Sequence, residues 1–389
     1  MSRLTIFHVG FLFLILFFTT TAKAQKEAET FNVDSTLYEY YQRCQEYLLE
    51  PVVLNMSDPL FRMAGERQDE RMQAVAIATQ LDYYYFQGTN EDSVIHYTNK
   101  VKEFAKATHQ PKYYYFAWAN RLITYYLKTS RTNIALYEVQ NMLKEAQEED
   151  DKTGLSRCYN IMSQIYTIKR FDSMAFEWRL KEIELTEKYK IENYNISQTY
   201  AQIANYYINQ KKQKEALAAV EKAIATANSS TQQISAKLEF VNYYSKFGDF
   251  QAAEKLLKEC QAAFEQDKRL ESIKKRLYNI ECLYYQQTKQ YQKALEAAKM
   301  QEKEERRLSE SILSSSHYRT QGEIYQKMGN MNLAVKYLQM YINTDDSLKI
   351  ANEQVASSEF ATLLNVEKLN AEKKELMLQA QEKELHNKT

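Results

Sequence analysis

Apolar residues recur along this chain at spacings of three and four residues, which is the pattern of amphipathic helices. Between residues 70 and 345 this pattern is also repeated in larger blocks, each marked by one tyrosine, which we call the anchor. Successive anchors lie 37 to 41 residues apart, a period that is typical of helical repeat proteins. The anchors are Tyr85, Tyr126, Tyr166, Tyr207, Tyr244, Tyr285 and Tyr325.

Small residues stand at a fixed distance from the anchors. Nine residues after the anchor there is an alanine in six blocks and a valine in the first. Two helices that cross closely leave room only for small side chains, so this offset predicts a seam between helices. Gly248 and Gly329 follow their anchors by four residues and are typical helix ends. Each block is therefore predicted to be a helix, a short turn and a second helix. The seam residues are Val94, Ala135, Ala175, Ala216, Ala253, Ala294 and Ala334.

This arrangement resembles the tetratricopeptide repeat family. The resemblance implies an all-α fold, a right-handed superhelical solenoid of helix-turn-helix repeats with a long C-terminal helix, that binds a protein or peptide and is not an enzyme. The chain departs from the family in its period, which is about 40 residues where the family has 34, and in lacking the closing proline. The residues that carry the resemblance most clearly are Tyr318-x-x-Gln321-Gly322-x-x-Tyr325, followed by Gly329, Ala334 and Tyr341.

Composition agrees with long helices, because 7 Gly and 3 Pro in 389 residues are too few for the turns of a sheet protein. The 51 basic residues equal the 51 acidic residues, which leaves no positive excess to neutralise phosphates. Nucleic acid is therefore not an expected partner. We find no nucleophile–base pair, phosphate-binding loop or metal-ligand spacing in the sequence. We expect no catalytic residue, no metal and no cofactor.

The amino terminus has the pattern of a secretory signal. Arg3 precedes an apolar run from Leu4 to Phe18, and Ala22-Lys23-Ala24 supplies small residues for cleavage. The run is shorter than the roughly 20 residues that a membrane span needs. Residues 1–24 are thus predicted to be a signal peptide and the chain to be exported to the periplasm. An uncleaved membrane anchor is the alternative.

Two segments flank the seven repeats of residues 70–345. Residues 25–69 are predicted to be a helical cap or degenerate repeat, with helices from Asp34 to Leu49 and from Pro59 to Arg67. Residues 346–389 are predicted to be one long helix that starts after the Asp-Asp-Ser sequence at 345–347. Leucine or valine recurs there on a seven-residue grid, so a coiled coil and a homodimer are expected alternatives to a solvated helix end. The grid positions are Leu348, Val355, Leu369 and Leu376.

Four cysteines leave two interpretations open. Cys260 and Cys282, two of the four at Cys44, Cys158, Cys260 and Cys282, occupy offsets where other repeats carry small residues, so these two are interpreted as small core side chains. An exported chain with an even number of cysteines also allows a disulfide. Cys260 and Cys282 are the expected pair, because the second helix of one repeat packs on the first helix of the next.

The binding residues are sought on the first helices, which line the groove in the family that the chain resembles. Asparagine is a poor helix former, so its recurrence two and six residues before the anchors suggests a use. An amide can donate to and accept from a peptide backbone, and arginine can bind a carboxylate through two bonds. An ordinary hydrophilic surface is the alternative interpretation. Alanine in place of these asparagines is expected to weaken binding and to leave stability unchanged or raised. The candidate residues are Asn120, Asn160, Gln164, Asn205, Asn242, Asn279, Arg157, Arg276, Tyr83 and Phe86.

A second resemblance concerns the whole arrangement. A signal sequence, long-period repeats and a final helix rich in Glu, Lys and Gln are similar to the periplasmic sensor region of membrane sensor histidine kinases and related regulators. This implies a module that binds a protein, peptide or small ligand and transmits its state through the last helix. Such a module would reach the membrane through a continuation after Thr389. A free periplasmic scaffold for protein assembly is the alternative.

Overall fold

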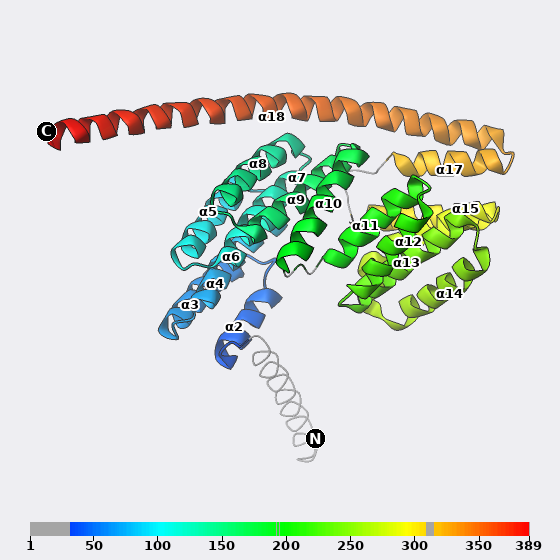
Figure 1. Ribbon diagram of the computed structural model, residues 1–389, viewed down its shortest axis with the longest axis horizontal. Coiled ribbons are helices and arrows are strands. Elements are labelled where there is room, and N and C mark those ends of the chain that lie inside the picture. Colours follow the sequence, from blue (N-terminus) through cyan, green and yellow to red (C-terminus); the bar gives the residue numbers. More distant parts are fainter. Residues whose placement is uncertain (1–31, 192, 194, 309–314, 389) are drawn as a thin grey trace, which may run out of the picture. The chain divides into compact units, whose positions relative to one another are not determined.

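The computed structural model describes residues 32–191, 193, 195–308 and 315–388 (Figure 1). Within these ranges the chain forms helices and turns and no strand, which confirms the all-α fold. No helix in the described part is both long and apolar enough to cross a membrane. The predicted signal peptide, residues 1–24, lies outside the described residues.

The chain divides into two compact units, Met1–Cys158 and Tyr159–Thr389. In the first unit each first helix is followed by a short turn and a second helix. The middle part of the third first helix is π-helical, so that α6, η1 and α7 follow one another without a loop. The helices are α2 (Ser35–Glu46), α3 (Val52–Glu66), α4 (Glu70–Gln87), α5 (Glu91–Ala107), α6 (Pro111–Tyr115), η1 (Phe116–Ile123), α7 (Thr124–Lys128), α8 (Thr132–Glu148) and the start of α9 (Lys152–Ile168).

The second unit continues the same alternation of first and second helices. A short 3-10 helix, η2, precedes the first helix α15. The elements after α9 are α10 (Asp172–Tyr189), α11 (Ile196–Asn209), α12 (Gln213–Ala225), α13 (Ser230–Phe247), α14 (Phe250–Gln266), η2 (Lys268–Ile273), α15 (Lys274–Gln287), α16 (Tyr291–Leu308), α17 (Ser316–Lys327) and α18 (Met331–Lys388).

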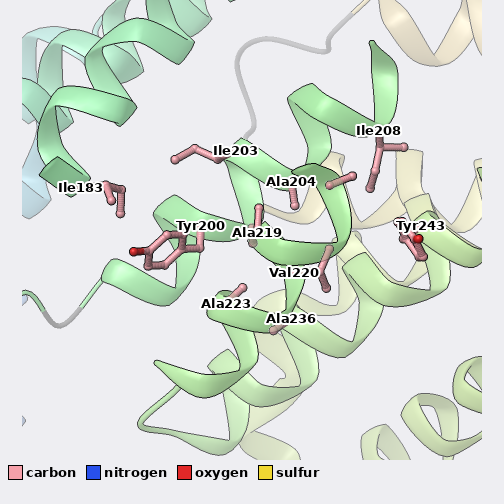
Figure 2. Close-up of a cluster of buried hydrophobic side chains, with 12 residues drawn as sticks. Ile183, Tyr200, Ile203, Ala204, Ile208, Ala219, Val220, Ala223, Ala236 and Tyr243 are labelled. Carbon is pink, nitrogen blue, oxygen red and sulfur yellow. The ribbon is translucent and has the colours of Figure 1, made fainter. Parts of the chain in front are cut away.

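Each hydrophobic core is shared by helices that are neighbours in the sequence. In Figure 2, Tyr200 and Ala204 of α11 lie with Ala219 and Val220 of α12 in one cluster. The seam prediction is confirmed, because all seven seam residues are at most 2% exposed. Side chains no larger than valine therefore stand at every first–second helix crossing.

The turn inside each repeat contains one residue in the left-handed conformation. Gly248 and Gly329 occupy two of these positions, as the sequence predicts, and their φ angles are 91° and 79°. After Gly248, the Asp249 side chain caps the second helix and accepts from the Ala252 amide at 3.0 Å. The remaining turns have the same positive φ at Gly88, Ser130, Arg170, Lys211 and Lys289.

The N-terminal cap differs from the prediction in its helix bounds. Asp34 is the N-cap of α2 and accepts hydrogen bonds from two backbone amides, but α2 ends at Glu46. Pro59 was expected to start the second cap helix, whereas it lies inside α3. A proline in a helix loses one backbone hydrogen bond. Packing outweighs this loss, because Val53 and Leu60 on either side of it are fully buried.

The last helix begins earlier than the sequence analysis placed it. We expected a new helix after residues 345–347, whereas α18 runs without a break from Met331 to Lys388. The Asp345 carboxylate does not cap a helix, because it accepts from Ser315 Oγ at 3.1 Å and lies 3.7 Å from Arg170. The second helix of the seventh repeat and the C-terminal segment are thus one helix of 58 residues. At 1.5 Å per residue it is about 87 Å long.

The predicted heptad grid on this helix is only partly described. Leu348 and Val355 are half-buried, and Leu376 is exposed. The Leu369 side chain lies outside the described part. A coiled coil through this grid remains a prediction.

The cysteines follow the first of the two interpretations. Cys44, Cys158, Cys260 and Cys282 are all buried and unbonded. Cys260 packs with Leu257 in one core cluster, whereas Cys282 belongs to another. The Cys260–Cys282 disulfide is therefore wrong, because each thiol fills the core of a different pair of repeats.

We predict that Ala294→Leu destabilises the second unit by about 1 to 3 kcal/mol, because the larger side chain overpacks a close helix crossing. Ala294 has no exposed surface. Urea unfolding of the variant and the parent measures the difference. As a control, Ala227→Leu changes a half-buried residue in the loop after α12. A parent-like midpoint for Ala294→Leu would contradict the seam.

Candidate functional site

A hollow of about 470 Å³ crosses the N-terminal halves of three successive first helices, α11, α13 and α15. We call it the polar groove. Hydroxyl and amide groups dominate its lining, and no carboxylate belongs to it. The lining residues are Ser197, Gln198, Ala201, Thr231, Gln232, Ser235, Ala236, Ser272, Ile273, Lys275, Arg276, Asn279 and Gln301.

Five polar side chains of this groove form no hydrogen bond with any residue that the structure describes. They are two glutamines, one asparagine and two hydroxyl residues that come from α11, α13, α15 and α16. Their donors and acceptors are therefore available to a ligand. These residues are Gln198, Thr231, Ser235, Asn279 and Gln301.

The two cationic residues of the groove are held by carboxylates outside it. Lys275 Nζ lies 3.3 Å from Glu305. Arg276 donates to Glu239 at 2.5 Å, and the Glu239 side chain is only 4% exposed. Arg276 is thus positioned by a buried carboxylate, and only part of its guanidinium faces the groove.

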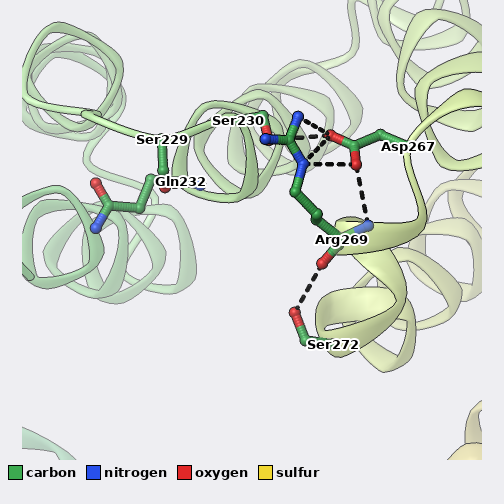
Figure 3. Close-up of polar contacts among 6 residues, drawn as sticks. All are labelled: Ser229, Ser230, Gln232, Asp267, Arg269 and Ser272. Atoms are coloured by element: carbon green, nitrogen blue, oxygen red, sulfur yellow. Dashed lines mark hydrogen bonds and ion pairs between the residues drawn. The ribbon is translucent and has the colours of Figure 1, made fainter. Parts of the chain in front are cut away.

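A second ion pair fixes the loop that borders the groove (Figure 3). Arg269 donates to both carboxylate oxygens of Asp267 at 2.8 Å, and Ser230 of α13 donates to the same carboxylate at 3.1 Å. The hydrogen bonds from Arg269 lower the pKa of Asp267 to about 2. This carboxylate is therefore ionised at neutral pH, and it ties the start of α13 to η2.

The structure places only two of the predicted second-unit residues in the polar groove, Arg276 and Asn279. Asn242 is buried and donates to Glu239 at 3.3 Å. Asn205 accepts from Asn209 at 2.9 Å and does not line the groove. Of the candidate asparagines of the second unit, only Asn279 therefore lines the groove.

Asn160 is engaged inside the protein. Its amide donates to both oxygens of Glu182 at 3.2 Å and accepts from Gln164 at 2.6 Å. Glu182 is 1% exposed and also accepts from Asn193 at 2.9 Å and Thr199 at 3.4 Å. Burial raises the pKa of Glu182, and the hydrogen bonds oppose that shift. The recurrence of asparagine here reflects a buried carboxylate that needs donors.

The four candidate binding residues of the first unit lie in different surroundings. Asn120 accepts from Arg157 at 2.9 Å, and burial lowers the pKa of Arg157. Tyr83 packs against the core cluster under α2 and α3. Phe86 is exposed, and the Arg121 guanidinium lies 5.6 Å from its ring centre. None of these four candidates lines a described hollow.

The first unit has a hollow of its own, which the sequence analysis did not find. It has a volume of about 640 Å³ and lies across the first helices α2, α4 and the start of α6. Aromatic and aliphatic side chains dominate its lining. The lining residues are Val33, Tyr38, Tyr41, Gln42, Gln45, Arg71, Met72, Val75, Gln110, Pro111, Lys112 and Tyr113.

The offset of nine residues before the anchor, from which Arg157 and Arg276 were predicted, is the one that lines the polar groove. Gln198, Ser235 and Arg276 stand nine residues before the anchors Tyr207, Tyr244 and Tyr285. Their side chains lie about two helical turns before the anchor, where the first helices begin. The signal is weak because glutamine, serine and arginine share no distinctive chemistry.

Comparison with known proteins identifies the fold. No family model and no curated protein matches the sequence. Among solved structures, the chain is similar to the apo form of the quorum sensor NprR from B. thuringiensis, with a TM-score of 0.52, 13% identity, and coverage of 82% of this chain and 91% of that chain. A tetratricopeptide repeat protein from Parabacteroides merdae gives a TM-score of 0.43 at 13% identity over 79% of this chain and 98% of that chain.

A Rap protein complexed with Competence and Sporulation Factor gives a TM-score of 0.48 at 15% identity, covering 84% of this chain and 92% of that chain. Together with the helix-turn-helix repeats described above, the likeness to NprR confirms an all-α fold of helical repeats.

Proposed function

We propose that this chain is a non-enzymatic binding module that holds an extended segment of a protein or peptide in the polar groove. The observation that carries the proposal is the set of five groove side chains that form no hydrogen bond with the described residues. Each can pair with a peptide N–H or C=O, and together they span three successive first helices. The groove is open along these helices, which suits an extended chain.

We further propose that the chain is an exported sensor module of a signal-transduction protein. The signal pattern of residues 1–24 supports export. The continuity of α18 with the last repeat supports transmission, because a helix without a break carries a movement of the repeats along its length. A free periplasmic scaffold would use the same groove.

Gln198→Ala/Asn279→Ala is expected to weaken peptide binding about tenfold or more. The double variant removes two amides, each able to form two hydrogen bonds of about 0.5 to 1.5 kcal/mol. The probe is an array of immobilised dodecapeptides, from which peptides retained by the parent are chosen and titrated in solution. Melting temperature should change little, because neither amide bonds to any part of the protein that the structure describes.

The matched control is Gln164→Ala/Asn205→Ala, which removes the same two residue types from first helices outside the groove. It should retain the affinity of the parent. An equal loss in both variants, or a loss in the control alone, would place the binding site elsewhere.

A further inference from the structure

The hollow across α2, α4 and the start of α6 differs in size and chemistry from the polar groove, and we call it the aromatic hollow. Its volume is about 640 Å³, whereas that of the polar groove is about 470 Å³. Sites for small molecules have volumes of about 300 to 1,000 Å³. The two hollows share no lining residue, so a ligand of the aromatic hollow would occupy a separate site.

Three tyrosines supply flat apolar surface in the aromatic hollow. Tyr38 and Tyr41 of α2 have ring centres 6.3 Å apart, with an angle of 50° between the rings. Burial raises the pKa of Tyr41 most, followed by the nearby Asp82 carboxylate, and Tyr113 of α6 is close enough to add to this shift. Rings of two helices thus face one hollow, and an aromatic ring of a ligand can pack on them edge to face or with an offset.

The aromatic hollow carries positive charge and no lining carboxylate. Its charged lining residues are Arg71 of α4 and Lys112 of α6. Arg71 lies 3.6 Å from Asp69 and donates to the Asn32 carbonyl at 2.7 Å, so its charge is partly neutralised. Lys112 is exposed and forms no ion pair with any described residue. The Lys112 ammonium is therefore available to an anion.

Carboxylates near the aromatic hollow are already paired. Asp34, which caps α2, lies 3.2 Å from the Arg67 guanidinium. Asp82 of α4 accepts from Arg121 at 2.5 Å, and neither carboxylate lines the hollow. They therefore do not neutralise Lys112.

Uncharged donors lie in the same hollow. Gln42 and Gln45 of α2 are half-buried, and their side chains form no hydrogen bond with any described residue. Each amide can donate to a carboxylate oxygen. The hollow thus combines aromatic rings, free amide donors and an unpaired cation.

We propose that the aromatic hollow binds a small aromatic carboxylate, with its ring among the tyrosines and its carboxylate at Lys112. Tyrosine rings match the ring of such a ligand, and the ammonium matches its charge. The site lies within the first unit and does not depend on peptide binding in the polar groove. It would give the module a second ligand of different chemistry.

Three small probes test the ring and the charge separately by ligand-observed NMR titration of the purified full chain. Phenylacetate should bind. Phenylacetamide has the same ring without the charge, and cyclohexylacetate has the charge without an aromatic ring. Each should bind at least about threefold more weakly than phenylacetate.

Lys112→Gln should weaken phenylacetate binding at least about threefold and leave phenylacetamide binding unchanged, because it removes only the partner of the carboxylate. Folding should be retained, since Lys112 is exposed, and a circular dichroism melt verifies this. The matched control is Lys144→Gln in α8, a lysine that is 77% exposed and does not line the hollow. It should bind both probes like the parent.

Tyr113→Leu tests the ring. Leucine keeps an apolar lining but removes the flat surface, so the preference for phenylacetate over cyclohexylacetate should fall to about one. Tyr47→Leu, at an exposed tyrosine outside the hollow, should keep the preference of the parent.

Three results would overturn the proposal. They are no phenylacetate binding by the folded parent at millimolar concentration, equal affinity for phenylacetate and phenylacetamide, and equal weakening by Lys112→Gln and Lys144→Gln. A dimer in sedimentation equilibrium that Lys112→Gln dissociates would also overturn it and would assign the hollow to a second copy. Gln198→Ala/Asn279→Ala should bind phenylacetate like the parent, so failure of the peptide groove and failure of this site are distinguishable.

Discussion

Arg276→Ala is expected to destabilise the second unit by about 3 to 5 kcal/mol, because it leaves Glu239 buried without its cation. Glu239 is 4% exposed, and its remaining hydrogen bond in the described structure comes from Asn242 at 3.3 Å. Urea unfolding followed by circular dichroism measures the loss. Arg276 was predicted from the sequence as a ligand contact, so this experiment separates its structural role from binding.

Two control variants test whether the unpaired Glu239 carboxylate causes the loss of stability. Arg276→Lys retains a cation and should recover part of the lost stability. Arg269→Ala removes an arginine from an exposed pair with Asp267, where the arginine side chain is 77% exposed, and should leave the unfolding midpoint close to that of the parent. If Arg276→Ala unfolds like Arg269→Ala, the Glu239 carboxylate is not held by Arg276 in solution.

Glu182→Ala is expected to lower the free energy of unfolding by about 3 to 5 kcal/mol, as Arg276→Ala does. The change leaves the amides of Asn160 and Asn193 without their acceptor and removes the charge that favours the buried Arg179 cation. Denaturant unfolding measures this loss as well. Asn160→Ala, which removes one donor to this charge, should cost about 1.5 to 3 kcal/mol. This replaces the expectation from the sequence that alanine at this position leaves stability unchanged or raised.

Asn205→Ala is the matched control for Asn160→Ala, because among the described residues the Asn205 side chain bonds only to the exposed amide of Asn209. It should unfold at nearly the parental denaturant concentration.

The pH dependence of the free energy of unfolding tests the role of Glu182 separately. Burial raises the pKa of Glu182 in the folded chain, so its contribution is present below the ordinary pKa of about 4.3 and is lost as pH rises through the folded pKa. The difference in stability between the parent and Glu182→Ala should therefore grow as pH falls from neutrality towards the ordinary pKa of a glutamate.

The repeat register could be predicted from the sequence because close packing restricts residue type at the seam. Only small side chains fit at positions such as Ala216 and Ala253, so the restriction repeats with the fold. The sequence predicted only some of the turns, because a residue in the left-handed conformation need not be glycine. Lys211 and Lys289 adopt positive φ at a local cost that the rest of the repeat outweighs.

The candidate site could be predicted less well, for two physical reasons. Asparagine is used both on surfaces and as a donor to buried carboxylates, and the sequence does not distinguish Asn279 in the groove from Asn160 beside Glu182. The choice of offset also mattered. The offset two residues before the anchor has no uniform surroundings, because Asn242 is buried whereas Gln164 is exposed. The groove lies about two turns nearer the helix start.

The sharing of each core by neighbouring helices alone has a consequence for how the molecule unfolds. A chain of elements with nearest-neighbour contacts can open from one end while the remainder keeps its structure. Glu182 and Arg276 lie in different repeats, so loss of either weakens a different stretch of the array. Hydrogen exchange resolved along the sequence would then record a gradient of opening free energies, and a single melting temperature would average over it.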